Sequence, residues 1–151
     1  GELAAARVLR EKVVQRRPIW LHVLELATLE FRLGESGSAR SRLEQLLEKQ
    51  PDNRFVQDGL AALEAYYGDL NRAAALYEEL IRLRPARPYF SNLGFIRYLL
   101  GDFAGAVVAH RQALALEPDH VLTRFNLATV FEAQGDLAAA RSIFDGGTKH
   151  L

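Results

Sequence analysis

The 34 residues from position 87 to position 120, RPYFSNLGFIRYLLGDFAGAVVAHRQALALEPDH, contain two apolar stretches interrupted by charges. The pair Gly101-Asp102 separates these stretches, and Pro118 follows the second one. A glycine suits the left-handed end of a helix, an aspartate suits the start of the next helix, and a proline cannot continue a helix. Neither stretch shows the alternation of a strand. The segment therefore predicts two helices joined by a short turn.

The same two markers recur along the whole chain. Gly-acidic pairs begin, at spacings of 34, 33 and 34 residues, at Gly34, Gly68, Gly101 and Gly135. Prolines follow at spacings of 33, 34 and 33 residues, at Pro18, Pro51, Pro85 and Pro118. Two markers that keep step over four periods predict a repeat protein in which each period is one pair of helices.

Small and large apolar residues repeat with this period. A leucine followed by a small residue occurs at Leu26-Ala27, Leu60-Ala61, Leu93-Gly94 and Leu127-Ala128. Gly1-Glu2 fits one period before Gly34, and five residues after each of these five glycines stands an alanine: Ala6, Ala39, Ala73, Ala106 and Ala140. Small residues at fixed points let helices approach closely, and their large neighbours fill the gaps. We therefore expect Gly94 to mark a close helix approach, and Gly101 to have positive φ.

The order Leu-small, Gly-Asp, Ala-x3-aromatic and Pro at this period resembles the tetratricopeptide repeat. The best match is residues 87–120, with Asn92-Leu93-Gly94, Gly101-Asp102-Phe103, Ala106, Ala113-Leu114 and Pro118. The resemblance implies an all-α, right-handed superhelical solenoid of antiparallel helix pairs, with about nine helices in a single array over residues 1–151. Residues 1–19 would be the second helix of a partial repeat, residues 20–53, 54–86 and 87–120 full repeats, and residues 121–151 a slightly truncated C-terminal repeat.

Two charge features depart from this family pattern. The aromatic residue in the middle of the inner helix is kept only as Phe131, and it is replaced by Glu30, Glu64 and Arg97. These are either poorly buried positions, or Glu64 and Arg97 form an ion pair between repeats that sets the curvature. The first helix is basic, with Arg7, Arg10, Lys12, Arg16 and Arg17. It is either a solvated face or a docking patch for an acidic partner or a membrane.

Composition excludes several kinds of function. The 19 basic and 19 acidic residues cancel, which argues against nucleic acid as a partner. The absence of cysteine excludes disulfides, zinc–thiolate sites and a cysteine nucleophile. The four histidines have no metal-binding spacing, and the glycines form no phosphate-binding loop. We therefore expect no catalytic site, no metal and no cofactor.

The family resemblance places the functional surface on the concave face of the inner helices. On this face the expected partner-binding residues are Phe31, Arg32, Phe55, Asp58, Tyr66, Asn92, Phe95, Tyr98, Phe125 and Asn126. In relatives, an asparagine in the slot of Asn92 and Asn126 bonds the main chain of an extended peptide. One subfamily grips the C-terminal carboxylate of chaperones with basic residues. In this sequence the positions of those basic residues hold Leu24, Asp58 and Leu122, so we do not expect a chaperone C-terminus as the ligand.

The sequence thus predicts a non-catalytic scaffold or adaptor that binds a partner peptide or helix. The alternatives are an assembly factor of a bacterial membrane-associated secretion or polysaccharide-export complex, or the substrate-selecting domain of a larger enzyme. The excess of arginine over lysine points to a GC-rich bacterial genome. Self-association through uncapped repeat ends is a further expectation. We expect a soluble fragment, with the cytoplasm favoured over a periplasmic or membrane-tethered location, and membrane contact only through segments outside it.

Overall fold

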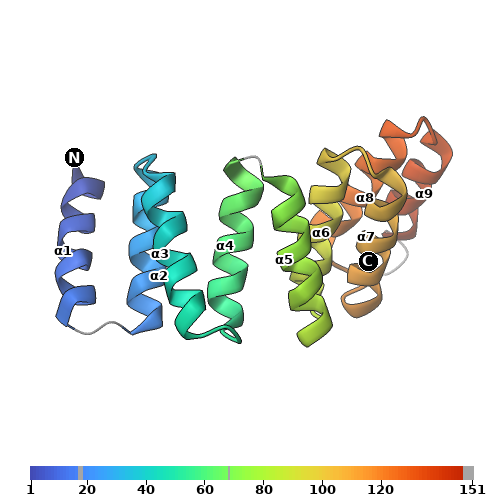
Figure 1. Cartoon of the computed structure of the whole chain (residues 1–151). Helices are drawn as coiled ribbons and strands as arrows, with labels where there is room; N and C mark the ends of the chain where they lie inside the picture. Colours follow the sequence, from blue (N-terminus) through green and yellow to red (C-terminus); the bar gives the residue numbers. More distant parts are fainter. Residues whose placement is uncertain (17–18, 68, 148–151) are drawn as a thin grey trace. The chain divides into compact units, whose positions relative to one another are not determined.

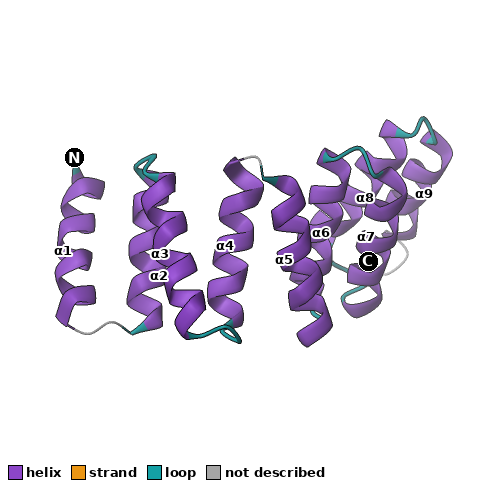
Figure 2. Ribbon diagram, viewed as in Figure 1, coloured by secondary structure: helices purple, strands orange, loops and turns teal. Residues whose placement is uncertain are grey.

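The computed structural model describes residues 1–16, 19–67 and 69–147, with side chains up to Phe144. These residues form nine α-helices and no strand, which confirms the all-α prediction (Figures 1 and 2). The helices are α1 (Glu2–Arg16), α2 (Trp20–Arg32), α3 (Ser36–Lys49), α4 (Arg54–Tyr67), α5 (Leu70–Leu83), α6 (Arg87–Leu99), α7 (Phe103–Leu116), α8 (Val121–Ala133) and α9 (Leu137–Gly147).

The chain divides into two compact units, Gly1–Asp69 with α1–α4 and Leu70–Leu151 with α5–α9. Within each unit every helix packs on the next one along the chain. In addition, α2 contacts α4 and α6 contacts α8, so the helices expected to be inner are neighbours. The division falls inside the repeat expected at 54–86. The single array and its superhelical path therefore stay a prediction.

Helix ends follow the markers in the sequence. Gly34, Gly101 and Gly135 have φ values of +82°, +79° and +80°, the left-handed conformation that favours glycine. The carboxylates of Asp102 and Asp136 accept hydrogen bonds of 2.9 Å from the backbone N–H groups three residues on. Gly68 lies outside the described residues. The left-handed glycines are confirmed where they are described, as are the caps at Asp102 and Asp136, whereas Glu35 makes no capping hydrogen bond.

The small-residue slots are the most buried positions of the helices. Ala39, Ala73, Ala106 and Ala140 retain at most 3% of their surface exposed. Gly94 permits a close approach of α6 to α7, because a Cβ there would lie 2.7 Å from the ring of His110 on α7. The expectation that Gly94 marks a close helix contact is therefore confirmed.

The interpretation of Glu30 and Glu64 as poorly buried positions is wrong. Their exposed fractions are 3% and 0%. Glu30 accepts from Nη2 and Nε of Arg42 at 2.6 and 3.0 Å, and Glu64 accepts from Arg40. The hydrogen bond to Glu30 raises the pKa of Arg42. Burial of these carboxylates is tolerated because each pairs with an arginine of α3, Glu30 of α2 with Arg42 and Glu64 of α4 with Arg40.

Arg97 finds its counter-ions within its own unit. Its Nη2 lies 2.9 Å from the carboxylate of Glu78 on α5, and its Nε lies 3.9 Å from that of Asp102. An ion pair between Glu64 and Arg97 would join the two units, and it stays a prediction.

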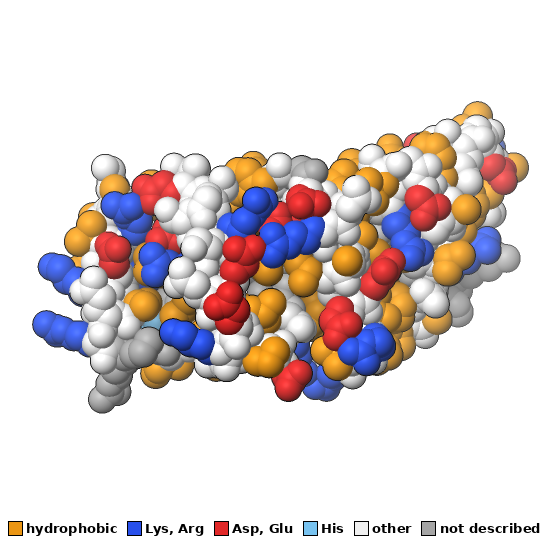
Figure 3. Space-filling view, in the orientation of Figure 1, with side chains coloured by type: hydrophobic (Ala, Val, Ile, Leu, Met, Phe, Trp, Pro, Cys, Tyr) orange, Lys and Arg blue, Asp and Glu red, His pale blue; other side chains and the backbone are white. Residues whose placement is uncertain are grey.

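Part of the basic character of α1 is neutralised inside the first unit. Arg7 pairs with Glu35 and Arg10 pairs with Glu25, each at 2.7 Å. Lys12 and Arg16 are exposed, while Arg17 lies outside the described residues. In the space-filling view, Lys and Arg side chains lie beside Asp and Glu side chains and do not gather by sign (Figure 3). A basic docking patch on α1 is therefore reduced to Lys12 and Arg16 among the described residues.

His110 on α7 is a polar side chain at a buried position of the second unit. It is fully buried, and neither ring nitrogen has a hydrogen-bond partner among the described residues. Burial lowers the pKa of His110 to about 4. Its slot holds Leu43 in α3 and Tyr77 in α5, so the position does not require a polar side chain.

Gly94→Val should destabilise the protein far more than Gly37→Val. The added side chain at Gly94 would press on the buried ring of His110, whereas a Cβ at Gly37 would have open space within 4 Å. Overpacking of this kind costs roughly 1–3 kcal/mol. Urea unfolding of the two variants measures the difference, and equal unfolding midpoints would contradict the repeat register.

The free energy of unfolding should fall as the pH drops from about 6.5 to about 4. The unfolded chain takes up a proton on His110 near the ordinary pKa of 6.5, whereas the folded chain resists until about pH 4. The contribution of neutral His110 to the free energy of unfolding is fully present above pH 6.5. The loss of this free energy reaches roughly 3 kcal/mol at pH 4. His110→Leu should flatten this part of the pH profile, as measured by urea unfolding at each pH. If His110→Leu leaves the pH profile unchanged, other titrating groups cause the pH dependence of stability.

Candidate functional site

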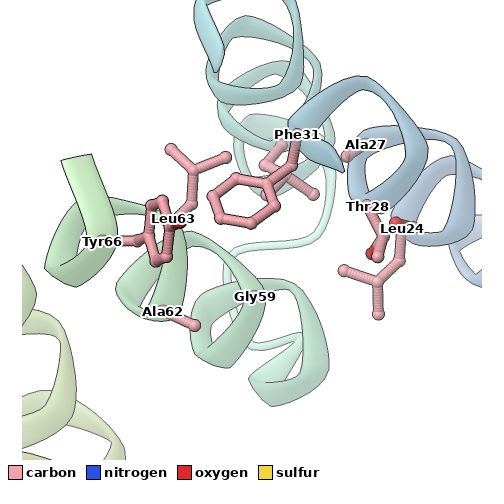
Figure 4. A pocket seen from close by; sticks show the side chains of 9 residues that line it. Leu24, Ala27, Thr28, Phe31, Gly59, Ala62, Leu63 and Tyr66 are labelled. Carbon is pink, nitrogen blue, oxygen red and sulfur yellow. Dashed lines mark hydrogen bonds between the residues drawn. The ribbon is translucent and has the colours of Figure 1, made fainter. Parts of the chain in front are cut away.

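Each unit contains a hollow between two successive inner helices. The first, which we call the α2–α4 hollow, has a volume of about 330 Å³. Phe31 of α2 and Tyr66 of α4 project toward one another across it (Figure 4). Its lining residues are Leu24, Ala27, Thr28, Phe31, Leu43, Gly59, Ala62, Leu63 and Tyr66.

The α2–α4 hollow is apolar. Two of its lining residues carry a hydroxyl, Thr28 and Tyr66. Thr28 Oγ1 already donates to the carbonyl of Leu24 at 2.9 Å. Gly59 keeps the hollow open, because a Cβ there would come within 2.6 Å of Leu24 Cδ1. A side chain that enters this hollow therefore meets hydrocarbon and aromatic surface.

An aromatic cluster closes one end of this hollow. The ring of Phe31 meets those of Tyr66 and Tyr67 edge-on, with centroids 4.9 and 5.1 Å apart. The hydroxyl of Tyr67 donates to the carbonyl oxygen of Phe31 at 3.3 Å. Tyr66 is nevertheless 75% exposed, so a large aromatic surface faces solvent beside the hollow.

The second, which we call the α6–α8 hollow, also has a volume of about 330 Å³, and more polar side chains line it than the first, although most of its wall is hydrocarbon. Its lining residues are Arg87, Ser91, Asn92, Phe95, His120, Leu122, Thr123 and Asn126.

A chain of hydrogen bonds fixes the wall of the α6–α8 hollow. His120 Nδ1 accepts from the backbone N–H of Thr123, which makes His120 the N-cap of α8. The hydroxyl of Thr123 lies 2.8 Å from this nitrogen, so it donates to it. The hydroxyl of Ser91 then donates to Thr123 Oγ1, 2.6 Å away. Ser91 and Thr123 are thus committed to holding α6 and α8 together.

The two asparagines of the hollow differ in their surroundings. Asn92 Nδ2 donates to the hydroxyl of Tyr77 on α5 at 2.9 Å. Asn126 has no hydrogen bond to any other described residue. Asn92 is thus oriented by the protein, while the amide of Asn126 is available to a ligand.

Half of the ten expected partner-binding residues line a hollow, namely Phe31 and Tyr66 in the first and Asn92, Phe95 and Asn126 in the second. The others lie outside both. Phe55 stacks on Trp20 with centroids 5.1 Å apart, and Tyr98 contacts Phe103 at 5.8 Å. Phe125 is 56% exposed on α8. Arg32 is exposed and Asp58 is half-buried.

Arg87 and His120 were not among the expected site residues. Both precede or open an inner helix, where the repeat pattern places no recurring residue. A polar residue directly before the apolar stretch 121–133 was the available signal, since that position is the N-cap. Arg87 is held by Glu117, whose carboxylate accepts from its Nε at 3.0 Å.

Among the described residues, no group of three or more His, Asp or Glu side chains could hold a metal ion. Across the same part of the chain, no helix is long and apolar enough to cross a membrane.

The chain belongs to the tetratricopeptide repeat family. Two sequence profiles of this family match it, one over residues 24–88 and one over residues 98–150. This confirms the resemblance seen in the sequence.

Two curated relatives are components of cellulose synthase operons by name. Cellulose synthase 2 operon protein C of Komagataeibacter xylinus is 32% identical over 98% of this chain and 12% of that protein. Cellulose synthase operon protein C of Xanthomonas axonopodis is 29% identical over 97% of this chain and 10% of that protein. The chain therefore spans about a tenth of the length of these relatives.

Solved structures share the fold at low sequence identity. MamA from Desulfovibrio magneticus has a TM-score of 0.86 at 14% identity, covering 99% of this chain and 85% of that one. A thermophilic tetratricopeptide repeat protein from Thermus thermophilus has a TM-score of 0.75 at 24% identity, covering 97% and 82%. These likenesses establish the fold alone.

Asn92→Ala should lower the free energy of unfolding by about 1 kcal/mol, because it removes the bond to the buried Tyr77 side chain. Asn126→Ala is the matched control in the equivalent slot of α8, and it should change stability little. Tyr77→Phe combined with Asn92→Ala should cost less than the sum of the two single changes. Thermal and urea unfolding measure all four variants. If the losses of unfolding free energy simply add, the Asn92–Tyr77 hydrogen bond does not contribute to stability.

Proposed function

We propose that this chain is a protein-interaction module that binds a partner through the α2–α4 and α6–α8 hollows. The observation that carries the proposal is that each unit places a hollow at the contact of two successive inner helices. An exposed aromatic side chain, Tyr66, lies beside the first hollow, and a half-buried amide, Asn126, lines the second.

The two hollows suit different parts of a partner. The α2–α4 hollow offers mainly apolar and aromatic walls, and its Thr28 hydroxyl is already bonded to the carbonyl of Leu24, so it suits an aliphatic or aromatic side chain. The α6–α8 hollow offers the amide of Asn126, which donates and accepts at once and therefore suits a main-chain peptide group. Arg87 and His120 add donors at the rim of that hollow.

We further propose that the module belongs to a larger assembly factor of a bacterial polysaccharide machine. Both named relatives are encoded in cellulose synthase operons by their printed names, and each is far longer than this chain. The partner would then be another component of the same complex. Helix-pair repeats suit this role because each unit adds surface without changing its neighbours.

The test is titration calorimetry against each purified protein encoded next to the full-length gene. Ala62→Glu would place a charge in the α2–α4 hollow, and Asn126→Ala would remove the amide from the α6–α8 hollow. Each should weaken binding by roughly 1–3 kcal/mol, because a partner group would be left unpaired or would meet a charge. Neither should alter the melting temperature much, since Ala62 is exposed and Asn126 has no hydrogen bond to another described residue.

Two variants outside the hollows serve as controls. Val108→Glu changes a residue of α7 that is 52% exposed, and Arg16→Glu changes the exposed end of α1. Both should bind like the unaltered chain. If Arg16→Glu abolishes binding while both hollow variants keep full affinity, the basic end of α1 is the site and the proposal is wrong.

A further inference from the structure

The α2–α4 hollow lies between two helices that line it with the same spacing. On each helix the lining residues follow the first one at three, four and seven positions, so each set lies on one helix face. The sets are Leu24, Ala27, Thr28 and Phe31 of α2, and Gly59, Ala62, Leu63 and Tyr66 of α4. Among the described residues that line this hollow, none is charged. An uncharged group of a partner therefore suits it.

Small side chains form the middle of both walls. Thr28 and Ala62 stand in the same slot of the repeat, two residues after Leu26 and Leu60. They come from opposite helices, and both are exposed (Figure 4). A group that enters between them meets little side-chain bulk on either wall.

Gly59 adds to the open space. The slot directly before the recurring leucine holds Glu25 in α2, Asn92 in α6 and Asn126 in α8, whereas α4 has no side chain there. Gly59 lies inside α4 and does not have positive φ, so its backbone conformation does not require glycine. A glycine inside a helix destabilises it relative to alanine. What Gly59 provides is room, since a Cβ would come within 2.6 Å of Leu24 Cδ1.

The second unit has an aromatic ring in the slot that is small in the first. Phe95 of α6 stands two residues after Leu93, as Thr28 stands two residues after Leu26. Phe95 lines the α6–α8 hollow and is 48% exposed. The repeat therefore accommodates a phenyl ring in this slot beside two inner helices. In the first unit the slot holds Thr28, and a hollow lies beside it.

The aromatic end of the α2–α4 hollow favours a ring over an aliphatic group. Phe31 meets Tyr66 and Tyr67 edge-on, and these two tyrosines meet each other edge-on with centroids 5.5 Å apart. Contacts of this kind stabilise beyond the apolar area that they bury. A further ring in the hollow can make such a contact with Phe31 or Tyr66, whereas an aliphatic side chain cannot.

We propose that the α2–α4 hollow receives an aromatic side chain of the partner, with its ring between Thr28 and Ala62 and against the aromatic cluster. This inference rests on the proposed function, and it specifies the chemistry of one anchor residue of the partner. Thr28 and Gly59 determine the specificity, because their small size leaves room for the ring.

The test uses two small probes, so it does not depend on knowing the partner. N-acetyl-phenylalaninamide carries a phenyl ring, and N-acetyl-cyclohexylalaninamide carries a saturated ring of similar size. The saturated ring buries at least as much apolar surface, so burial alone does not favour the phenyl probe. In an NMR titration followed at the methyl groups of Leu24 and Ala62, the phenyl probe should bind roughly two- to tenfold more tightly. Equal affinities, or no binding of the phenyl probe, would overturn the proposal.

Thr28→Phe locates the binding site. It gives the first unit the ring that Phe95 gives the second, so it should fill the hollow and weaken binding of the phenyl probe by roughly tenfold or more. Thr129→Phe is the matched control, because it makes the same change in the same slot of α8 and leaves the α2–α4 hollow unaltered. If Thr28→Phe binds the probe like the unaltered chain, the proposal is wrong.

A second variant fills the hollow from the other helix. Gly59→Asn installs in α4 the residue that α6 and α8 carry in this slot, and it should also abolish binding of the phenyl probe. Circular dichroism shows whether each variant keeps its helices. Unchanged probe affinity in a folded Gly59→Asn chain contradicts the proposal even where Thr28→Phe does not fold.

The aromatic site and the proposed function can fail separately. If the phenyl probe binds in the hollow and no protein encoded beside the full-length gene binds the chain, the aromatic site stands and the proposed function is wrong. If one of those proteins binds, Asn126→Ala weakens it and Thr28→Phe leaves its affinity unchanged, the partner does not place an aromatic side chain in the α2–α4 hollow and this inference is wrong.

Discussion

The structure depends on close contact between helices at small side chains. Ala39, Ala73, Ala106 and Ala140 are almost without exposed surface. Ala39, Ala106 and Ala140 each lie five residues after a left-handed glycine that follows the preceding helix. A larger side chain at these points would push the helices apart. It would thereby remove dispersion contacts between neighbouring helices. The repeat period exists because each pair of helices must present the same small surfaces to its neighbours.

Close contact forces neighbouring side chains to match in size and charge. Where α7 carries the ring of His110, α6 has a glycine, since a Cβ would collide with that ring. Where α2 carries Glu30, α3 supplies Arg42. Where α8 keeps the aromatic residue Phe131, α9 supplies Ile143. One slot of the repeat is therefore filled by different chemistry in different helix pairs, and each pairing is complementary because an unmatched buried charge would be costly.

The same spacing creates the surface for binding. Beside the contact of two successive inner helices lies a hollow, and its walls combine recurring residues such as Ala27 and Leu63 with residues that the repeat does not specify, such as Tyr66. In the first unit Phe31 and Tyr66 line the hollow, and in the second unit two amides and a hydrogen-bonded histidine line it. The same repeat can thus present two different surfaces, because the side chains that distinguish the hollows, such as Tyr66 and Asn126, lie outside the recurring apolar slots.

The sequence by itself determined the repeat, the helix pairs, the left-handed glycines and the close approach at Gly94, because these depend on local backbone conformation and on a strict period. It also placed five of the ten expected binding residues, such as Tyr66 and Asn126, beside a hollow. Only the tertiary structure decided that Glu30 and Glu64 are buried, and that Asn92 is already bonded to Tyr77. These facts depend on partners supplied by other helices. The period of one helix does not reveal what the neighbouring helix brings to the contact.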